Sequence, residues 1–352
     1  MKLLIKPLIQ EPVIFLLTII LLLVGIYILH SLSPDLFPQY YLYLILSILV
    51  FYIFYSIGFE IIKYFSAHLY VLSIILLLLT LIIGRVTRGA IRWIPLGIFS
   101  FQPSEIIRPF LLIFFARILS IKINGIKNIL FYAFLAALPI ILIAIQPSFG
   151  VALLTLIGIS SIFVIKKVNR KNLLIILILI LTTIPSMWYF LKPYQKERVI
   201  TFFSYSSDPR GAGYNTIQSI IAVGSGGIFG RGFKKGFQTQ LRFLPEKHTD
   251  FVFAGISEEL GFLGSASLLI IIFIIIYRIL YLAGKSKDGV YTLFSIGTAI
   301  ILLTETLINV GMNIGLLPIT GLPLPLVSAG GSSIISLLIT FSLLINGKNI
   351  KP

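Results

Sequence analysis

The feature that most constrains this chain is a series of apolar runs, each about as long as a bilayer is thick. A helix needs roughly 20 apolar residues to cross the ~30 Å hydrocarbon core. Ten such runs occur in the 352 residues, at approximately 13–31, 40–59, 67–84, 104–120, 128–146, 149–166, 172–191, 251–282, 290–311 and 330–347. The sequence therefore predicts an all-α polytopic membrane protein with ten transmembrane helices, built as a single membrane domain over residues 1–352.

Composition and charge narrow the class of protein further. Hydrophobic residues make up 58% of the chain and charged residues 11%, whereas soluble domains average roughly 45–50% and about 25%. A net charge of +16 would favour nucleic acid in a soluble domain, but here the basic residues mark cytoplasmic loops, so no nucleic-acid partner is predicted. The chain has no cysteine and only three histidines, which excludes thiolate chemistry and makes a histidine-based metal cluster improbable.

The distribution of basic residues predicts the orientation of the chain. Fifteen of the 28 basic residues lie in the two termini and in the connections on the same side as the termini. The short connections on the opposite side hold Arg85, Arg88 and Arg92. By the positive-inside rule both termini are cytoplasmic, and the large loop 192–250 between the seventh and eighth helices is extracytoplasmic.

The large loop contains two segments of interest. Loops this long are usually functional. Residues 213–224 have apolar side chains at helical spacing and predict an amphipathic helix at the outer interface. Residues 224–232 include five glycines, which suit either close backbone approach to a ligand or a flexible connector.

Acidic residues are scarce, so those near the membrane are candidates for function. Glu105 and Arg108 follow Gln102-Pro103-Ser104, which predicts a helix start at Pro103 with Ser104 or Gln102 as the cap. Their i, i+3 spacing places both charges on one helix face. They form either a neutralising ion pair or the lining of a polar cavity, in which Arg108 would meet an anionic head group.

Asp250 is the strongest candidate for a general base. It is the last polar residue before an apolar helix, so its carboxylate is partly desolvated, and Lys247 and His248 lie beside it in the chain. The structural alternative is that Asp250 or Thr249 caps this helix. Two turns deeper, one of Glu258 and Glu259 is expected to face inward with a partner. Glu305 in the ninth span raises the same question, whereas solvated surface roles are expected for Glu11, Asp35, Glu60 and Asp288.

Residues 309–333 connect the last two spans and carry too many prolines and glycines for a continuous helix. Their polar content is low, so we expect the segment to fold back into the protein at membrane depth. Ser328, Ser332 and the neighbouring backbone would contact an anion or a sugar there, with simple helix capping as the alternative.

Taken in order along nearly the whole chain, these motifs resemble the SEDS (shape, elongation, division and sporulation) family of cell-wall polymerases. The motifs are 89–97 (GAIRWIPLG), 102–105 (QPSE), 146–147 (QP), 213–214 with 218–219, 224–227 (GSGG), 245–251 (PEKHTDF), 258–261 (EELG) and 309–333. The short termini and the proline pattern of the last motif are more similar to the RodA members than to the FtsW members. Arg108, Ser148 and Ala329 stand where the family usually has Lys, Asp and Tyr.

The resemblance implies a peptidoglycan glycosyltransferase that polymerises lipid II during cell elongation in the bacterial plasma membrane, with its active site on the extracytoplasmic side. It implies that Asp250 takes the proton of the acceptor 4-hydroxyl while undecaprenyl pyrophosphate leaves. The implied partners are a class B penicillin-binding transpeptidase and other proteins of the elongation complex. Candidate substrate contacts are Arg92, Glu105, Arg108, Arg198, Gln218, Lys247, His248, Ser328 and Ser332.

Several alternatives stay open at this point. A septal, FtsW-like polymerase would have the same chemistry, and the charged residues within spans are compatible with a lipid II flippase, although transport usually needs a site at the midplane. A non-catalytic scaffold for the transpeptidase is a third interpretation. No cofactor is required by the chemistry; Mg²⁺ or Mn²⁺ would stabilise the leaving pyrophosphate, but few carboxylates are available to hold it.

Overall fold

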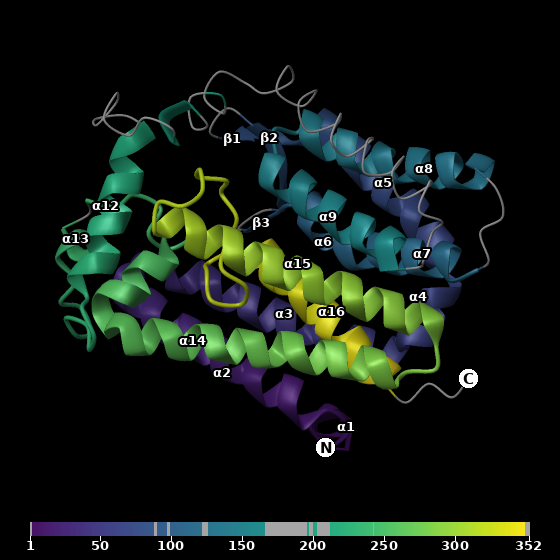
Figure 1. Cartoon of the computed structure of the whole chain (residues 1–352), viewed down its shortest axis with the longest axis horizontal. Coiled ribbons are helices and arrows are strands. Elements are labelled where there is room, and N and C mark those ends of the chain that lie inside the picture. Colours follow the sequence, from purple (N-terminus) through teal and green to yellow (C-terminus); the bar gives the residue numbers. More distant parts are fainter. Residues whose placement is uncertain are drawn as a thin grey trace.

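The chain folds into a bundle of long helices, shown in Figure 1. The structure is a computed structural model that describes residues 2–87, 90–96, 99–121, 126–165, 196, 200–202, 212–241 and 243–348. The helices are α1 (Lys2–Gln10), α2 (Pro12–Leu32), η1 (Pro34–Leu36), α3 (Phe37–Ile57), α4 (Phe59–Tyr64), α5 (Ser66–Ile83), α6 (Pro103–Ile106), α7 (Arg108–Ser120), α8 (Ile126–Ile145), α9 (Phe149–Ile165), α12 (Ala212–Ser225), α13 (Phe237–Gln240), α14 (Val252–Lys285), α15 (Gly289–Asn313) and α16 (Gly331–Gly347).

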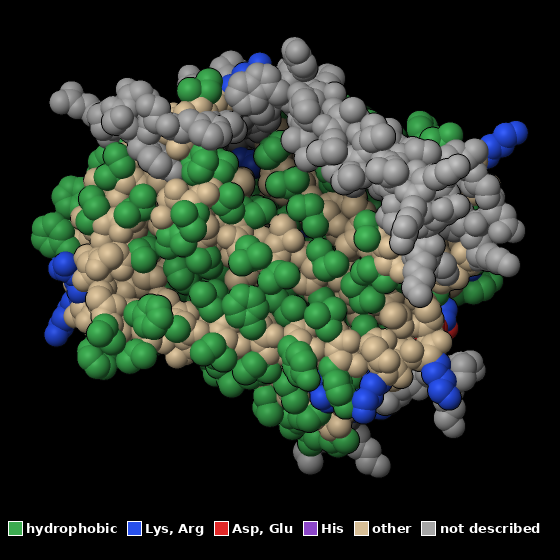
Figure 2. Space-filling model, in the orientation of Figure 1, with side chains coloured by type: hydrophobic (Ala, Val, Ile, Leu, Met, Phe, Trp, Pro, Cys, Tyr) green, Lys and Arg blue, Asp and Glu red, His purple; other side chains and the backbone are tan. Residues whose placement is uncertain are grey.

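The apolar runs of the sequence correspond to these helices. Each predicted span falls on one or two of them except 172–191, which lies outside the described residues. Five helices of the described chain are long and apolar enough to cross a membrane, and three shorter apolar helices accompany them. Figure 2 shows hydrophobic side chains across the middle of one face, with Lys and Arg gathered toward its ends. This is the pattern of a multi-pass membrane protein.

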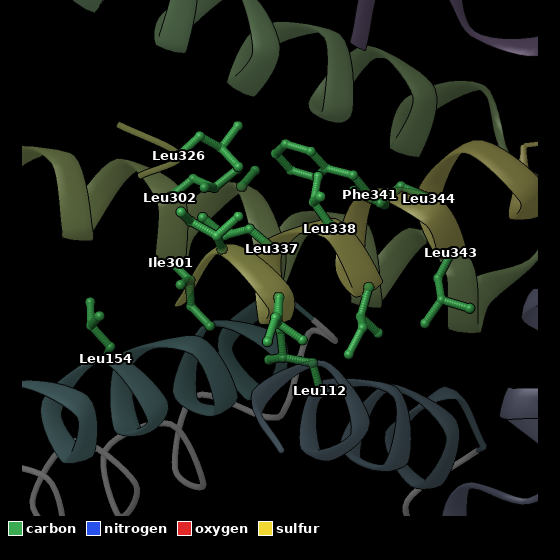
Figure 3. Close-up of a cluster of buried hydrophobic side chains, with 14 of the residues drawn as sticks. Leu112, Leu154, Ile301, Leu302, Leu326, Leu337, Leu338, Phe341, Leu343 and Leu344 are labelled. Atoms are coloured by element: carbon green, nitrogen blue, oxygen red, sulfur yellow. The ribbon is translucent and has the colours of Figure 1, made fainter. Parts of the chain in front are cut away.

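The core lies between α16 and the helices around it. α16 packs against α3 and contacts α7 and α15, while α15 packs against α7, α9 and α14. Figure 3 shows leucine and isoleucine side chains from these helices interdigitating, among them Leu112, Leu154, Ile301 and Leu337. Nearly every residue of α16 is buried, including the hydroxyl-bearing residues Ser332, Ser336 and Thr340.

Polar side chains inside the spans bond to their own helices. Thr18, Ser73 and Thr306 donate to the carbonyl oxygens of Ile14, Leu69 and Leu302, four residues earlier, at 2.7 Å in each case. A hydroxyl in hydrocarbon must find an acceptor because water is absent, and the preceding turn supplies one. Such residues therefore fit within a span without marking a site.

A small sheet is the main departure from the expected all-helical chain. Strands β1 (Arg85–Thr87), β2 (Ala90–Leu96) and β3 (Phe99–Phe101) form an antiparallel sheet in the order β1-β2-β3 between α5 and α6. Ile94 pairs with Phe101 and Leu96 with Phe99. The hydroxyl of Tyr43 in α3 donates to the Ser100 carbonyl oxygen at 2.6 Å and accepts from the Ser100 N–H at 3.0 Å. This contact fixes β3 against the bundle.

The helix α14 is broken at Gly261, and the glycine-rich loop fills the break. Gly261 has φ +68°, so the ladder of helical hydrogen bonds is interrupted there. Loop N–H groups of Arg231 and Gly232 donate to the carbonyl oxygens of Glu258 and Glu259 at 2.9 and 3.0 Å. In return, the N–H groups of 262 and 263 donate to loop carbonyl oxygens at 2.8 and 3.1 Å.

These contacts decide the role of the glycines. A Cβ at Gly226 would lie 1.8 Å from the Ser257 carbonyl oxygen, and one at Gly230 would lie 2.2 Å from that of Glu259. The loop needs glycine at both positions because it approaches another backbone closely. Glycine is therefore required at these two positions for packing of the loop against α14, whereas nothing lies within 4 Å of a Cβ at Gly224 or Gly227.

Helix α12 and the 309–333 segment agree with prediction. The expected amphipathic helix at 213–224 is α12. Between α15 and α16 the chain is non-helical from 314 to 330 and turns back into the protein, so that Leu322, Leu324 and Val327 are almost completely buried. Protein encloses most of residues 322–328, whereas Ile314, Leu316 and Leu317 are exposed.

The end of the molecule that carries the α14–α15 turn is held by ion pairs. Glu11, which was expected to be solvated, is fully buried and accepts from Arg278 Nε at 2.6 Å and from Lys348 Nζ at 2.8 Å. Asp288 caps α15 through the N–H groups of Val290 and Tyr291, and it pairs with Lys63 at 2.6 Å. These contacts join α2, the two ends of the α14–α15 turn and the C-terminal end of α16.

Candidate active site

A polar cavity of about 440 Å³ opens at the end of the bundle opposite the α14–α15 turn. Four segments distant in sequence line it: β2 with the start of α6, the α8–α9 turn, residues 246–250, and the 309–333 segment. The polar lining residues are Arg92, Gln102, Glu105, Ser148, Glu246, His248, Thr249, Asp250, Thr320, Ser332 and Ser333. The sequence singled out residues from three of these segments, and the fold brings them together.

Asp250 lies at the centre of this arrangement and is half-buried. Gly321 has φ +74°, and a Cβ there would lie 3.6 Å from Asp250 Oδ2, so the backbone of the 309–333 segment passes close to the carboxylate. The N-cap position of α14 is occupied by Phe251, with no side-chain cap hydrogen bond. Neither Asp250 nor Thr249 therefore stands at the N-cap position, and the Asp250 carboxylate lies in the cavity wall.

The turn that carries Asp250 is docked on the 309–333 segment through three successive carbonyl oxygens. The His248 oxygen accepts from the Ala329 N–H at 2.8 Å, and the Thr249 oxygen accepts from Ser328 Oγ at 2.7 Å. The Asp250 oxygen accepts from the side-chain amides of Asn309 and Asn313 at 3.2 and 3.0 Å. The position of this turn is thus fixed by the segment that forms the opposite wall.

The two candidate serines have internal partners. Ser328 accepts from the Leu324 N–H at 2.8 Å in addition to its bond to Thr249, and it is buried behind the cavity wall. Ser332 lines the cavity, and its hydroxyl accepts from the Gln102 N–H at 2.8 Å. Neither hydroxyl caps α16, whose N-cap is Gly330 without a side-chain bond. Of the two, Ser332 is placed to contact a substrate.

The sequence foresaw either an ion pair or a cavity lining for Glu105 and Arg108, and the structure shows both. Glu105 lines the cavity, whereas Arg108 lies behind it and pairs with Glu105 and, at 3.5 Å, with Glu305. All three side chains are almost completely buried. Arg108 is therefore engaged by internal carboxylates and does not meet a head group in this structure. Helix α6 does begin at Pro103, but its N-cap residue Gln102 makes no side-chain cap bond, which corrects that expectation.

Two other candidate contacts, Lys247 and Gln218, lie away from the cavity. Lys247 donates through Nζ to the Thr239 carbonyl oxygen. Gln218 is on α12, and its neighbour Ser219 makes the link to the site by donating to the Asn313 carbonyl oxygen at 2.9 Å. Arg198 lies outside the described residues. Among the candidates, Arg92, Glu105, His248, Asp250 and Ser332 are the ones that the cavity unites.

Glu258 and Glu259 are both buried, whereas the sequence predicted that one of them would face inward. Glu258 accepts from the N–H groups of Gln238 and Thr239 at 2.7 and 3.1 Å and so caps α13. Glu259 accepts from Ser31 Oγ at 2.5 Å and from Gln240 Nε2 at 3.3 Å. These glutamates stabilise the packing around the break in α14 and do not reach the cavity.

The sequence did not single out Trp93, Glu246, Asn309 and Asn313. Trp93 lines the cavity beside Arg92, and Glu246 lines it with φ +52°, an unusual conformation for a residue with a side chain. The two asparagines lie four residues apart on α15 and are fully buried, and no pattern local to α15 identifies their partners.

Metal binding has no support in the described part of the chain. No three of its His, Asp or Glu side chains are grouped so that they could hold a metal ion.

Comparison with known proteins assigns the family. A family model described as "Cell cycle protein", covering FtsW, RodA and SpoVE, matches residues 11–351. The chain belongs to this family. This confirms the SEDS resemblance of its motifs.

Relatives and solved structures agree with this assignment. The chain is 38% identical over 291 residues to peptidoglycan glycosyltransferase MrdB of Escherichia coli K12, covering 80% of this chain and 77% of the relative. It is 36% identical over 349 residues to a probable peptidoglycan glycosyltransferase FtsW of Buchnera aphidicola subsp. Baizongia pistaciae, covering 93% and 90%.

Two solved structures share the fold over nearly the whole chain. One, from a study of how a peptidoglycan synthase complex coordinates polymerization and crosslinking, has a TM-score of 0.80 and 32% identity, covering 95% of this chain and 96% of the other. The rod shape determining protein RodA of Thermus thermophilus has a TM-score of 0.72 and 26% identity, with 95% of each chain covered.

Proposed function

We propose that this chain is a peptidoglycan glycosyltransferase that polymerises lipid II at the extracytoplasmic face of the plasma membrane, with Asp250 as the general base. The observation that carries the proposal is the polar cavity at one end of a membrane bundle, with the Asp250 carboxylate in its wall. Named peptidoglycan glycosyltransferases are relatives over most of the chain.

The reaction needs one base, one cation and an opening that admits a lipid-linked sugar. Asp250 accepts the proton of the acceptor 4-hydroxyl while that oxygen attacks the anomeric carbon of the donor. The bond from this carbon to the pyrophosphate breaks, and undecaprenyl pyrophosphate leaves with the electron pair. Arg92, in the cavity wall, would bind the anionic pyrophosphate, and the proton then passes from Asp250 to water.

The orientation of the chain follows from charge. The α14–α15 turn, the Glu11 cluster and Lys63 share one end of the bundle, which the positive-inside rule assigns to the cytoplasm. With both termini there, the cavity faces outward. This is the side on which glycan strands are built.

Transport of lipid II is the weaker alternative. It was motivated by charges within spans, but Arg108 pairs with both Glu105 and Glu305, and Glu258 caps α13. A non-catalytic scaffold is distinguished by whether the chain makes glycan without a partner. A class B penicillin-binding transpeptidase and the other elongation proteins remain the proposed partners, and a role in elongation is distinguished from septation by complementation of strains depleted of RodA or of FtsW.

The decisive experiment is polymerisation of labelled lipid II by the purified chain, compared with Asp250→Asn. The variant keeps the shape of the side chain and cannot accept the proton, so glycan product should fall by about 100-fold or more while lipid II binding persists. Ser333→Ala, in the same wall, serves as the control. Full polymerisation by a folded Asp250→Asn protein would overturn the role of Asp250, and lipid II translocation without glycan would overturn the enzyme assignment.

A further inference from the structure

A side chain of helix α15 binds two backbone groups at the start of α14. In a continuous helix the N–H of Ala254 would donate to the carbonyl oxygen of Asp250, four residues earlier. Instead, the Ala254 N–H donates to Asn313 Oδ1 at 3.0 Å, and Asn313 Nδ2 donates to the Asp250 oxygen at 3.0 Å. The first hydrogen bond of α14 runs from the Gly255 N–H to the Phe251 oxygen at 3.2 Å, and the carboxamide of Asn313 occupies the place of the next bond toward the N-terminus.

All four side-chain amide hydrogens of Asn309 and Asn313 have acceptors. An amide nitrogen carries two hydrogens. Those of Asn313 go to the oxygens of Asp250 and Asn309, and those of Asn309 go to the oxygens of Asp250 and Leu322 at 3.2 and 2.7 Å. Asn313 Oδ1 also accepts from Ser219 Oγ at 3.3 Å. Both asparagines are fully buried, so bulk water cannot replace these hydrogen bonds when one of them is removed.

We propose that Asn313 is a positioning residue for Asp250. Its inserted carboxamide keeps Asp250 outside α14 and so directs the carboxylate into the cavity. Without the amide, the Ala254 N–H would be left buried and unpaired, and the Asp250 oxygen would keep only the bond from Asn309 at 3.2 Å, so the two groups would gain by bonding to each other. That bond extends α14 toward its N-terminus and turns Asp250 into the helix, away from the cavity. The inference rests on the proposed role of Asp250 as the base.

At the other end of the bundle, the carboxamide of Asn346 bridges two backbone groups in the same way, which provides a matched control. Asn346 Oδ1 accepts from the Phe59 N–H at 3.0 Å, and Asn346 Nδ2 donates to the Tyr55 carbonyl oxygen at 3.0 Å. Phe59 and Tyr55 are again four residues apart, on either side of Gly58. Changes at Asn346 therefore remove the same chemistry at a position far along the bundle from the cavity.

The test compares Asn313→Leu with Asn346→Leu in steady-state polymerisation of lipid II by the full chain. Leucine has a similar volume and cannot bridge the two backbone groups. Both variants should lose similar thermal stability, but Asn313→Leu should lower kcat by about 100-fold with little change in KM, because misplacement of a catalytic group affects the chemical step. Asn346→Leu should leave the kcat of folded protein unchanged. Equal effects of the two variants on kcat would overturn the inference.

A second readout does not depend on activity. The chain has no cysteine, so Asp250→Cys introduces a single thiol. A small water-soluble maleimide should modify this thiol readily in the otherwise native chain and in the Asn346→Leu background, and slowly in the Asn313→Leu background. Unchanged modification in the Asn313→Leu background would overturn the inference. If the native chain makes no glycan but modification slows as expected, the proposed function fails and the positioning stands.

Asn313→Asp covers the case in which the leucine variant does not fold. The carboxylate still accepts from Ala254, but in its ionised form it cannot donate to the Asp250 oxygen. We expect a smaller loss of kcat than in Asn313→Leu, together with a displacement of the pH dependence of kcat, since the new charge lies beside the base. A native kcat and native pH dependence would contradict the proposal.

Discussion

At the scale of single residues, the triad of Glu105, Arg108 and Glu305 contains two buried carboxylates and one guanidinium. Arg108 lies within ion-pair distance of both acids. Among the described residues, none donates a hydrogen bond to either carboxylate oxygen of Glu305. The net negative charge makes the triad depend on its one cation. Because Glu105 also lines the cavity, Arg108 acts on the site through the position of Glu105.

This charge balance predicts opposite effects of removing either sign. Arg108→Met leaves two carboxylates buried without a cation and should destabilise the protein by about 3–5 kcal/mol. Glu305→Gln keeps the Glu105–Arg108 pair, and its stability should equal or exceed that of the native chain. Thermal unfolding in detergent measures both, and Glu60→Gln, at a side chain that is 54% exposed, is the control. An Arg108→Met protein that unfolds at the native temperature would contradict the dependence on this cation.

At the scale of elements, the break in α14 is stabilised by the glycine-rich loop. Four backbone hydrogen bonds join residues 227–232 to 258–263, and they pair groups that Gly261 removes from the helix. A helix broken at membrane depth is tolerated only when its freed N–H and C=O groups find new partners. The loop and the two halves of α14 should therefore behave as one unit.

Alanine substitutions within the loop test this unit. Gly226→Ala and Gly230→Ala place a methyl group against the carbonyl oxygens of Ser257 and Glu259 and should cost at least about 1–3 kcal/mol of stability. Gly224→Ala is the matched control, because nothing lies within 4 Å of its Cβ position. Limited proteolysis of the loop, with thermal unfolding, measures the effect. If all three variants behave alike, close backbone approach is not the reason for the glycines.

At the scale of the whole molecule, the parts that the sequence predicts are those set by local physics. Apolar length predicted the helices, and proline and glycine content predicted the irregular 309–333 segment. The cavity was foreseen in part, because Glu105 and Asp250 stand out as acids near the membrane. The bonds between Asn313 and the start of α14 join residues 59 and 63 positions apart, and Glu11 is buried against partners 267 and 337 positions away. A single sequence contains no local pattern that pairs Glu11 with Arg278.

The ion pairs at the end opposite the cavity predict how the stability of the whole bundle depends on pH. Burial alone would raise the pKa of Glu11, but hydrogen bonds from Arg278 and Lys348 hold it below the ordinary value of 4.5. Burial and the Lys63 hydrogen bond oppose each other in the same way at Asp288, whose pKa is held below 3.8. A lowered pKa means that the folded chain binds protons less readily than the unfolded chain, so this stability is present above these values and is lost as the pH falls through them.

The unfolding temperature should therefore decrease on acidification from about pH 6 to about pH 3. Glu11→Gln should unfold at a lower temperature than the native chain at neutral pH, and the difference between the two should shrink as the pH falls, because protonation removes from native Glu11 what the variant already lacks. Glu60→Gln, whose carboxylate is largely exposed, should follow the native curve throughout. A difference in unfolding temperature between Glu11→Gln and the native chain that stays constant across this pH range would show that the Glu11 cluster stabilises the bundle by packing and not by charge.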